Sequence, residues 1–208
     1  GGRDLHLSGP LTVTTTDDLA ICLLGEPLAR FRADYPGIDL SVIVDNQFFN
    51  LSKRQADVAI RPTNAPPETL VGRRVSGLAV AVYAARDAED KPLKDQPWLA
   101  CDDSLSHLAA AKWQRREFGG AEVALRSNNL LTLMTGTVRG MGVALLPCFM
   151  ADPERRLRRL TDPIDEAASA LWLLTHEDLR NTQRIRTFTD HMADALSARR
   201  DLLEGRGP

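Results

Sequence analysis

The sequence predicts an α/β fold with mostly parallel sheets, and three observations support this. Short runs of β-branched or apolar residues, typical of strands, recur along the chain. Between them lie segments whose apolar residues repeat every three or four positions, which is the spacing of one helix face. The composition, 43% hydrophobic and 26% charged over 208 residues, is typical of a globular chain with one large domain or two smaller ones. Strands that alternate with helices in such a chain indicate an α/β fold.

The first strand is expected at residues 11–15, where Leu11 and Val13 alternate with threonines. Residues 78–84 are continuously apolar, as in a strand buried on both faces. Proline lacks the N–H group that a sheet needs, so Pro62 and Pro147 are expected to end their strands. The other strands are expected at residues 38–44, 57–61, 71–75, 98–101, 123–125, 143–146 and 170–174.

Helices are expected where a capping side chain precedes an apolar repeat. Thr16 or Asp17 can cap the first helix, which Pro27 should kink or restart and residues 35–37 should end. The other expected helices are one at residues 51–56, one capped by Asp102 or Asp103, one capped by Ser127 or Asn128 and ended by Gly140, and one at residues 182–197.

The charge balance argues against direct nucleic-acid binding by this chain. It has 26 Lys and Arg against 28 Asp and Glu, a net charge of −2, and a pI of about 6.1. Domains that bind DNA usually have a basic face and a pI above ~9. The densest basic run, residues 154–160, contains no aromatic residue and is interpreted as a solvated or subunit-contacting face.

The sequence favours a cytoplasmic location. The longest apolar run, residues 78–85, is much shorter than the ~18 residues of a membrane span, and no export leader is recognised. Three cysteines at wide spacing, with no CxxC motif, are typical of reduced thiols in the cytoplasm.

No enzyme chemistry, cofactor or metal site is expected. The sequence contains no Gly-x-Ser-x-Gly, no His-Glu-x-x-His and no P-loop. Gly140-Met-Gly142 follows an expected helix and precedes a strand, the reverse of the dinucleotide-binding order. The four histidines do not have metal-ligand spacing and are interpreted as surface or core residues.

Four motifs in order resemble the effector-binding domain of LysR-type transcriptional regulators. Residues 9–20 and 28–40 resemble the opening of that domain, and the run from Arg54 to Arg61 (RQADVAIR) is similar to its R-x-A-D-V-A-I-R strand. Residues 127–130, followed by 138–147 with their Gly-x-Gly turn, are similar to the signature of its second half. The resemblance runs from about residue 9 to residue 198.

The resemblance implies a fold like that of type II periplasmic binding proteins: two lobes joined by two crossover strands, with a small-molecule effector bound in the cleft between them. Lobe I is expected at residues 10–83 and 166–205, and lobe II at residues 84–165. The family's N-terminal winged helix-turn-helix is absent from this chain, so DNA would be bound only through that missing domain. The resemblance also implies a homo-oligomer, a dimer or tetramer, that associates through the helix at residues 17–33 and the strand near Val44. A solute-binding protein of a transport system is the alternative.

Two strand-to-helix junctions, residues 14–17 and 127–129, place short polar side chains where unpaired backbone N–H groups gather. These side chains are interpreted either as plain helix caps or, through the resemblance, as effector contacts. The candidate effector-binding residues are Thr15, Thr16, Asp17, Arg61, Thr63, Asp103, Ser127 and Asn128.

The chemistry of the effector is left open by the charges near the first junction. Arg61 could donate two parallel hydrogen bonds to an effector carboxylate, or it could form a salt bridge at the rim of the site. Asn46 and Gln47 are weaker candidates. Asp17 and Asp18 put two carboxylates beside the first helix N-terminus and would repel an anionic effector, so a neutral or amine-bearing ligand is also expected.

Overall fold

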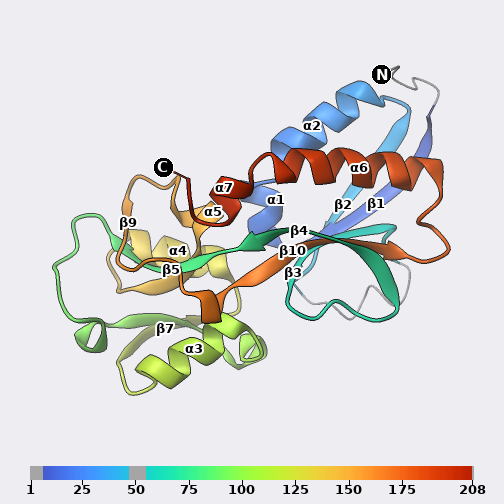
Figure 1. The fold of residues 1–208 in the computed structure, drawn as a ribbon. Helices are drawn as coiled ribbons and strands as arrows, with labels where there is room; N and C mark the ends of the chain where they lie inside the picture. Colours follow the sequence, from blue (N-terminus) through green and yellow to red (C-terminus); the bar gives the residue numbers. More distant parts are fainter. Residues whose placement is uncertain (1–6, 47–54, 208) are drawn as a thin grey trace. The chain divides into compact units, whose positions relative to one another are not determined.

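The chain forms two compact units in a computed structural model that describes residues 7–46 and 55–207. The first unit comprises Gly1–Ser76 and Ala170–Arg200, and the second comprises Gly77–Ser169 and Asp201–Pro208. Both units contain strands and helices, so the predicted α/β class is confirmed (Figure 1). The division falls at residues 76 and 169, whereas the sequence prediction placed the lobe boundaries at 83 and 165.

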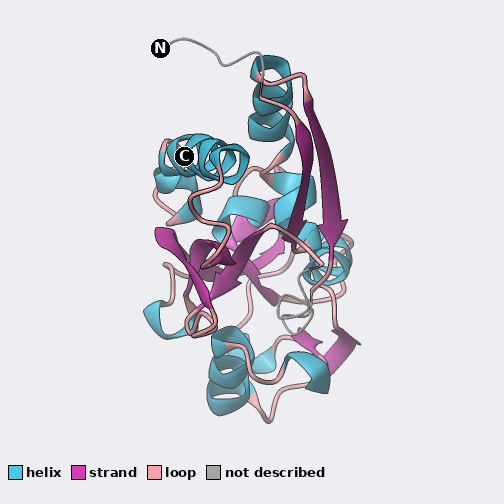
Figure 2. Ribbon diagram, turned by 90° about the vertical axis from the view of Figure 1, so that its right-hand side faces the viewer, coloured by secondary structure: helices cyan, strands magenta, loops and turns pink. Residues whose placement is uncertain are grey.

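The first unit is built on a five-stranded sheet in the order β2-β1-β3-β10-β4. Its strands are β1 (Gly9–Thr15), β2 (Ile38–Val44), β3 (Val58–Thr63), β4 (Leu70–Leu78) and β10 (Ser169–His176). β1 lies between β2 and β3 and runs parallel to both. The long parallel pair β1–β2 is visible in Figure 2. β10 runs antiparallel to β3, so the sheet is mixed.

Helices α2 and α6 run side by side over this unit (Figure 1). The helices of the unit are α1 (Asp17–Cys22), α2 (Gly25–Asp34) and α6 (Gln183–Ser197), and the short α7 (Arg200–Leu203) begins at its end. Phe31 of α2 is 1% exposed, and its ring packs edge-on against Phe188 of α6, with ring centroids 5.0 Å apart. Buried aromatic pairs of this geometry stabilise beyond their buried area, so this contact fixes α2 on α6.

The second unit is built around the buried strand β5 (Val80–Ala85), which lies between β8 (Ala144–Pro147) and β9 (Leu157–Arg159) and runs antiparallel to both. A separate parallel pair consists of β6 (Trp98–Cys101) and β7 (Val123–Ser127). The helices are α3 (Ala109–Phe118), α4 (Leu130–Val138) and α5 (Cys148–Ala151), with 3-10 turns at Leu93–Asp95, Asp103–Leu105 and Asp165–Ala167. Trp98 is fully buried in this core, stacks on Phe118 at 4.8 Å and donates its indole N–H to the Leu93 carbonyl.

The end of the chain belongs to the second unit. The Leu203 carbonyl accepts a hydrogen bond from the Ala79 amide at 2.9 Å, and Leu203 itself is fully buried. Arg159 donates to the Gly205 carbonyl at 3.2 Å. The prediction had placed residues up to 205 with the first lobe.

Two expectations about strands are wrong. The sheets are not mostly parallel, because β5 runs antiparallel to β8 and β9, and β10 runs antiparallel to β3. A continuously apolar run shows that a strand is buried on both faces, but it does not show the strand's direction. Pro62 lies inside β3 instead of ending it, paired with Leu171. The pairing of β3 with β1 stops at Ile60, so β3 has an open side at Pro62, where a missing N–H costs little.

The helix predictions hold for α1, α2 and the end of α4, and the start of α3 is shifted. α1 and α2 are separated at Leu23 and Leu24, which confirms the expected restart, and Pro27 sits in the first turn of α2, where its missing N–H is not needed. Gly140, with a φ of 81°, follows α4 as expected. The helix expected after residues 102–103 begins only at Ala109. The helix expected at residues 51–56 lies largely outside the described residues, and residues 55–56 are not helical.

Candidate functional site

The carboxyl ends of β1, β2 and β3 meet at one edge of the first unit's sheet. Thr15 of β1 is in register with Val44 of β2 on one side and with Ile60 of β3 on the other. Carboxyl ends of parallel strands, followed by helix N-termini, are where α/β proteins commonly bind ligands. We refer to the polar residues gathered here as the strand-end cluster: Thr14, Thr15, Thr16, Asp17, Asp45, Asn46 and Arg61.

Arg61 joins the three strand ends from inside the unit. It is 2% exposed, and its guanidinium donates to the Thr14 hydroxyl of β1 at 2.7 Å and to the Asp45 carbonyl that follows β2. Burial lowers the pKa of this guanidinium, and the charge of Asp45 acts in the opposite direction. The expectation that Arg61 lies at the rim of the site is therefore wrong, because its side chain points into the protein interior.

The N–H groups at the start of α1 are already satisfied by side chains of the protein. The Asp17 amide donates to Oδ1 of Asn46 at 3.2 Å, the Asp18 amide to Oδ1 of Asp17 at 2.8 Å, and the Leu19 amide to Oδ1 of Asp18 at 2.9 Å. The Thr16 hydroxyl donates to that same Asp18 oxygen at 2.5 Å and does not cap the helix. Of the two expected caps, Thr16 makes no capping bond, and Asp17 accepts only from the amide of the neighbouring Asp18. The other two amides donate to Asn46 and Asp18.

Asp18 carries its carboxyl group into the interior of the first unit, where it is 5% exposed. Burial raises its pKa above the usual aspartate value, and the hydrogen bonds from Thr16 and Leu19 oppose that shift. Of the two acidic residues at this junction, only Asp17 is partly open to solvent.

Thr15 differs from its neighbours Thr14 and Thr16, whose hydroxyls are both hydrogen-bonded. Its side chain is fully buried, and its hydroxyl has no hydrogen-bond partner in the described part of the chain. A buried hydroxyl without a partner costs about 1–3 kcal/mol, and such groups are rare in folded proteins. Of the predicted site residues, Thr15 therefore has a polar group that is free to accept or donate a new bond.

Thr63, the remaining predicted site residue of the first unit, forms a hydrogen bond within its own loop. The Thr63 hydroxyl, at the end of β3, accepts a hydrogen bond from the Ala65 amide at 3.0 Å, which closes a local turn. Gln47 lies outside the described residues.

In the second unit, Asp103, Ser127 and Asn128 all follow or end the parallel pair β6–β7. Cys101 is in register with Ser127, and the Asp102 amide donates to the Ser127 carbonyl at 3.0 Å, so these residues do come together. Asp102 caps the 3-10 turn by accepting from the Ser104 amide at 2.9 Å, while Asp103 stays exposed.

The cap of α4 is Asn129 and not Ser127 or Asn128, which corrects the sequence prediction. The Asn129 side chain accepts from the Thr132 amide at 3.0 Å, and the Ser127 hydroxyl accepts from the Asn129 amide at 3.1 Å. Asn128 is exposed between them. The cap falls at Asn129 because β7 continues through Ser127 before the chain turns.

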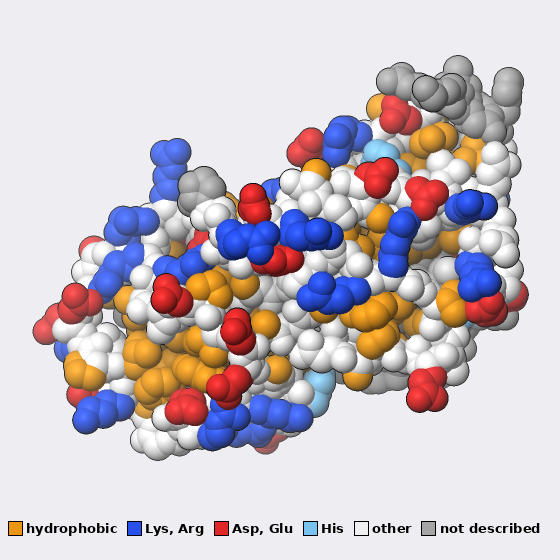
Figure 3. Space-filling model, in the orientation of Figure 1, with side chains coloured by type: hydrophobic (Ala, Val, Ile, Leu, Met, Phe, Trp, Pro, Cys, Tyr) orange, Lys and Arg blue, Asp and Glu red, His pale blue; other side chains and the backbone are white. Residues whose placement is uncertain are grey.

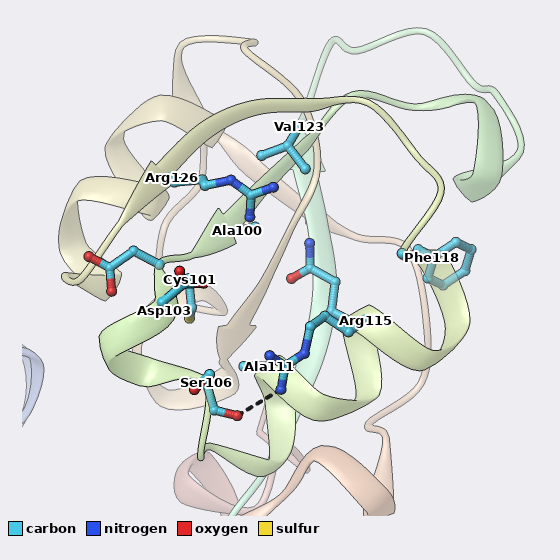
Figure 4. Close-up of a pocket in the computed structure, with 12 residues that line it drawn as sticks. Ala100, Cys101, Asp103, Ser106, Ala111, Arg115, Phe118, Val123 and Arg126 are labelled. Atoms are coloured by element: carbon cyan, nitrogen blue, oxygen red, sulfur yellow. Dashed lines mark hydrogen bonds between the residues drawn. The ribbon is translucent and has the colours of Figure 1, made fainter.

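A cavity of about 80 Å³ lies beside β6, β7 and α3 in the second unit (Figure 4). Twelve residues line it: Ala100, Cys101, Asp102, Asp103, Ser106, Ala111, Gln114, Arg115, Phe118, Gly119, Val123 and Arg126. Among the predicted site residues only Asp103 borders it. Burial raises the pKa of the Cys101 thiol to about 11, so that thiol is protonated at neutral pH.

Within residues 7–46 and 55–207, no three His, Cys, Asp or Glu side chains are grouped to hold a metal ion. No helix in the same part of the chain is long and apolar enough to cross a membrane. On the face shown in Figure 3, Lys and Arg side chains are interspersed with Asp and Glu.

Comparison with known proteins gives a consistent result. Residues 5–197 match the family described as the LysR substrate binding domain. The chain is 26% identical over 190 residues to the Mau operon transcriptional activator of Paracoccus denitrificans. This match covers 89% of this chain and 64% of the length of that protein. It thus spans less than two thirds of the length of the curated relatives that it matches.

Many solved structures share the fold, among them the regulatory domains of CrgA and MexT. The regulatory domain of CrgA, a LysR-type regulator from Neisseria meningitidis, superposes with a TM-score of 0.77 at 21% identity, covering 91% of this chain and 100% of that one. The regulatory domain of MexT, a transcriptional activator in Pseudomonas aeruginosa, gives a TM-score of 0.73 at 19% identity, covering 91% and 98%.

Proposed function

Since this chain belongs to the family of LysR substrate binding domains, we propose that it is the sensing part of a transcription regulator and binds a small-molecule effector. The family match covers most of the chain and confirms the predicted α/β fold of two lobes like those of type II periplasmic binding proteins. It sets aside the alternative of a solute-binding protein for transport. In the whole protein, effector binding would shift the population of domain arrangements and so change how the regulator acts on DNA.

The observation that carries the proposal is the buried Thr15 hydroxyl, which has no partner in the described part of the chain. It lies at the carboxyl end of β1, beside Thr16 and Asp17, and an effector that bonds to it would remove the cost of leaving it unpaired. Arg61 holds the strand ends together through Thr14 and Asp45. We therefore propose Thr15, Thr16 and Asp17 as effector contacts and Arg61 as the residue that positions them.

The charges of this cluster favour a neutral or amine-bearing effector. Asp17 is partly exposed at the start of α1, while the Arg61 guanidinium is buried and already donates to two oxygen atoms. Thr63 of the first unit and Asp103, Ser127 and Asn128 of the second remain proposed contacts. Their surroundings neither require nor oppose that role.

The test is a thermal-shift screen against amines, amino acids, neutral metabolites and aromatic acids, followed by calorimetry with Thr15→Val. A ligand at a hundredfold excess over its dissociation constant stabilises by ~2.7 kcal/mol. Thr15→Val should weaken binding by ~1 kcal/mol or more, and it should not destabilise the free protein because it removes an unpaired hydroxyl. Thr12→Val, on the same strand, is the control. Unchanged affinity in Thr15→Val would overturn the assignment of Thr15 as a contact.

We also propose that the protein is a homo-oligomer that associates through β2 and α1. Among the described strands β2 is at the edge of its sheet, and its residues Val42, Ile43 and Val44 are 39%, 44% and 49% exposed. Ile21 of α1 is 71% exposed. An open edge strand with apolar side chains favours association with a second copy. Ile43→Lys should then lower the mass seen by light scattering, while Asp39→Asn on the same strand should not.

The remaining parts of the proposal concern the whole protein. We propose that it acts in the cytoplasm and contacts DNA through a separate helix-turn-helix domain, and that this chain is a binding domain and not an enzyme. The relative in Paracoccus is described as a transcriptional activator, which supports this view. A gel-shift assay with the full-length regulator and its own promoter would test it. This chain alone should not shift the promoter.

A further inference from the structure

The cavity in the second unit combines an apolar wall with polar groups from three elements. Ala100 of β6, Val123 of β7 and Phe118 of α3 contribute apolar surface. Gln114 comes from α3. In Figure 4, Arg115 also comes from α3 and Arg126 from β7. Pockets that bind small molecules typically have this make-up, a mostly apolar lining with a few convergent polar groups.

Gln114 is the first sign that the cavity takes a polar ligand. The residue is 9% exposed and lines the cavity, yet its side-chain amide makes no hydrogen bond to any described residue. This amide offers two donors and an acceptor to a molecule in the cavity. A ligand in the cavity would supply the missing partner.

The cavity also has two cationic groups. The Arg126 guanidinium forms no hydrogen bond or ion pair within the described part of the chain, and in Figure 4 it extends from β7 toward the cavity. Arg115 donates one N–H to the Ser106 carbonyl at 2.9 Å, which leaves other N–H groups of its guanidinium for a ligand. A guanidinium offers parallel N–H groups that match a carboxylate.

Two carboxylates balance these cations. Asp102 is engaged, because its Oδ1 accepts from both the amide and the hydroxyl of Ser104. Asp103 is exposed at the edge of the cavity, and its side chain has no partner among the described residues. A purely anionic ligand would meet both carboxylates, whereas a ligand with one negative and one positive group matches the lining.

We propose that this cavity binds a small zwitterionic α-amino acid, with its carboxylate held by Arg126 and Gln114 and its ammonium group by Asp103. The cavity of about 80 Å³ has room for the head group and a short side chain. Glycine and alanine match this size. The argument rests on the second unit alone and does not depend on effector binding at the strand-end cluster.

The experiment is a titration of the ¹⁵N-labelled chain, followed by amide NMR, which detects weak binding. The probes are L-alanine, propionate, which lacks the ammonium group, and ethylamine, which lacks the carboxylate. L-alanine at millimolar concentration should shift the Gln114 side-chain NH₂ signal and the amides of β6 and β7. Propionate and ethylamine should each bind about tenfold more weakly or worse, since each lacks one charged contact.

Three variants separate the contacts. Arg126→Gln should raise the dissociation constant for L-alanine about tenfold or more, and Asp103→Asn should remove the preference for L-alanine over propionate. Lys112→Gln removes a positive charge from α3 outside the cavity and should change nothing. Thr15→Val should also leave alanine binding unchanged, which separates this site from the strand-end cluster.

Two results would overturn the proposal. The cavity is not an amino-acid site if L-alanine leaves the Gln114 side-chain signal unmoved. The zwitterion assignment is wrong if propionate binds as tightly as L-alanine to the unchanged chain.

Discussion

Replacing Arg61 by methionine tests whether this residue positions the site or contacts the effector. The change removes two hydrogen bonds, to the Thr14 hydroxyl and to the Asp45 carbonyl, from a side chain that is 2% exposed. A hydrogen bond from a charged group contributes ~1.5–3 kcal/mol, and the acceptors left behind are unsatisfied. We expect Arg61→Met to lower the free energy of unfolding by about 3–5 kcal/mol, a large part of a typical ~5–15 kcal/mol.

Urea denaturation followed by circular dichroism measures this loss directly. For a chain of this size each kcal/mol corresponds to about 2–4 °C in Tm. Arg74→Met, which removes an exposed arginine from β4, is the control and should change stability by less than ~0.5 kcal/mol. Adding Thr14→Val to Arg61→Met should recover part of the loss, because the orphaned hydroxyl is then gone. An Arg61→Met protein as stable as the unchanged chain would refute the positioning role and favour a direct effector contact.

Three further predictions concern other sites. Gly72→Ala should destabilise the first unit by several kcal/mol, because the added Cβ would lie 1.8 Å from the Leu173 carbonyl oxygen. Gly120→Ala is the control, because its Cβ would meet no atom within 4 Å. Urea denaturation of the two variants compares their free energies of unfolding. The pKa of Asp18 is raised by burial, so its contribution to stability is full below the unfolded-state pKa and is lost as the pH rises through the folded-state pKa. Asp18→Asn should therefore raise Tm at pH 7, and this gain over the unchanged chain should disappear in acid. An equal change in Tm at both pH values would contradict a raised pKa of Asp18. The Cys101 thiol, with a pKa of about 11, should react slowly with iodoacetamide at pH 8 and faster as the pH approaches 11, as read by mass spectrometry of the labelled peptide.

Sequence patterns located the elements well where one residue type decides the structure. The strand at residues 38–44 was predicted with its observed bounds, since an apolar run begins after the Pro-Gly that ends α2. Pro27 and Gly140 marked a helix restart and a helix end because proline and glycine constrain the backbone by themselves. The late start of α3 was not predictable, because Asp102 closes a 3-10 turn onto Ser104 first.

The candidate site was predictable only in part. The order of the strands was enough to expect polar residues at the ends of β1 and β3, and they do gather there. That Arg61 turns inward follows from the carbonyl and hydroxyl it meets, both supplied by other strands. The cavity of the second unit was missed because Gln114 and Arg126 belong to elements whose packing has no short sequence signal.

The position of β10 sets the order in which the protein can form during synthesis. β10 lies between β3 and β4 in the first sheet, yet it consists of residues 169–176, and α6 follows it. On the ribosome, the residues up to the end of β10 must therefore emerge before the first sheet can close. The second unit is almost contiguous in sequence. It consists of residues 77–169 and is completed by residues 201–208. Nascent chains halted before β10 would thus have an open β3 edge, which favours chaperone binding or aggregation until β10 has emerged.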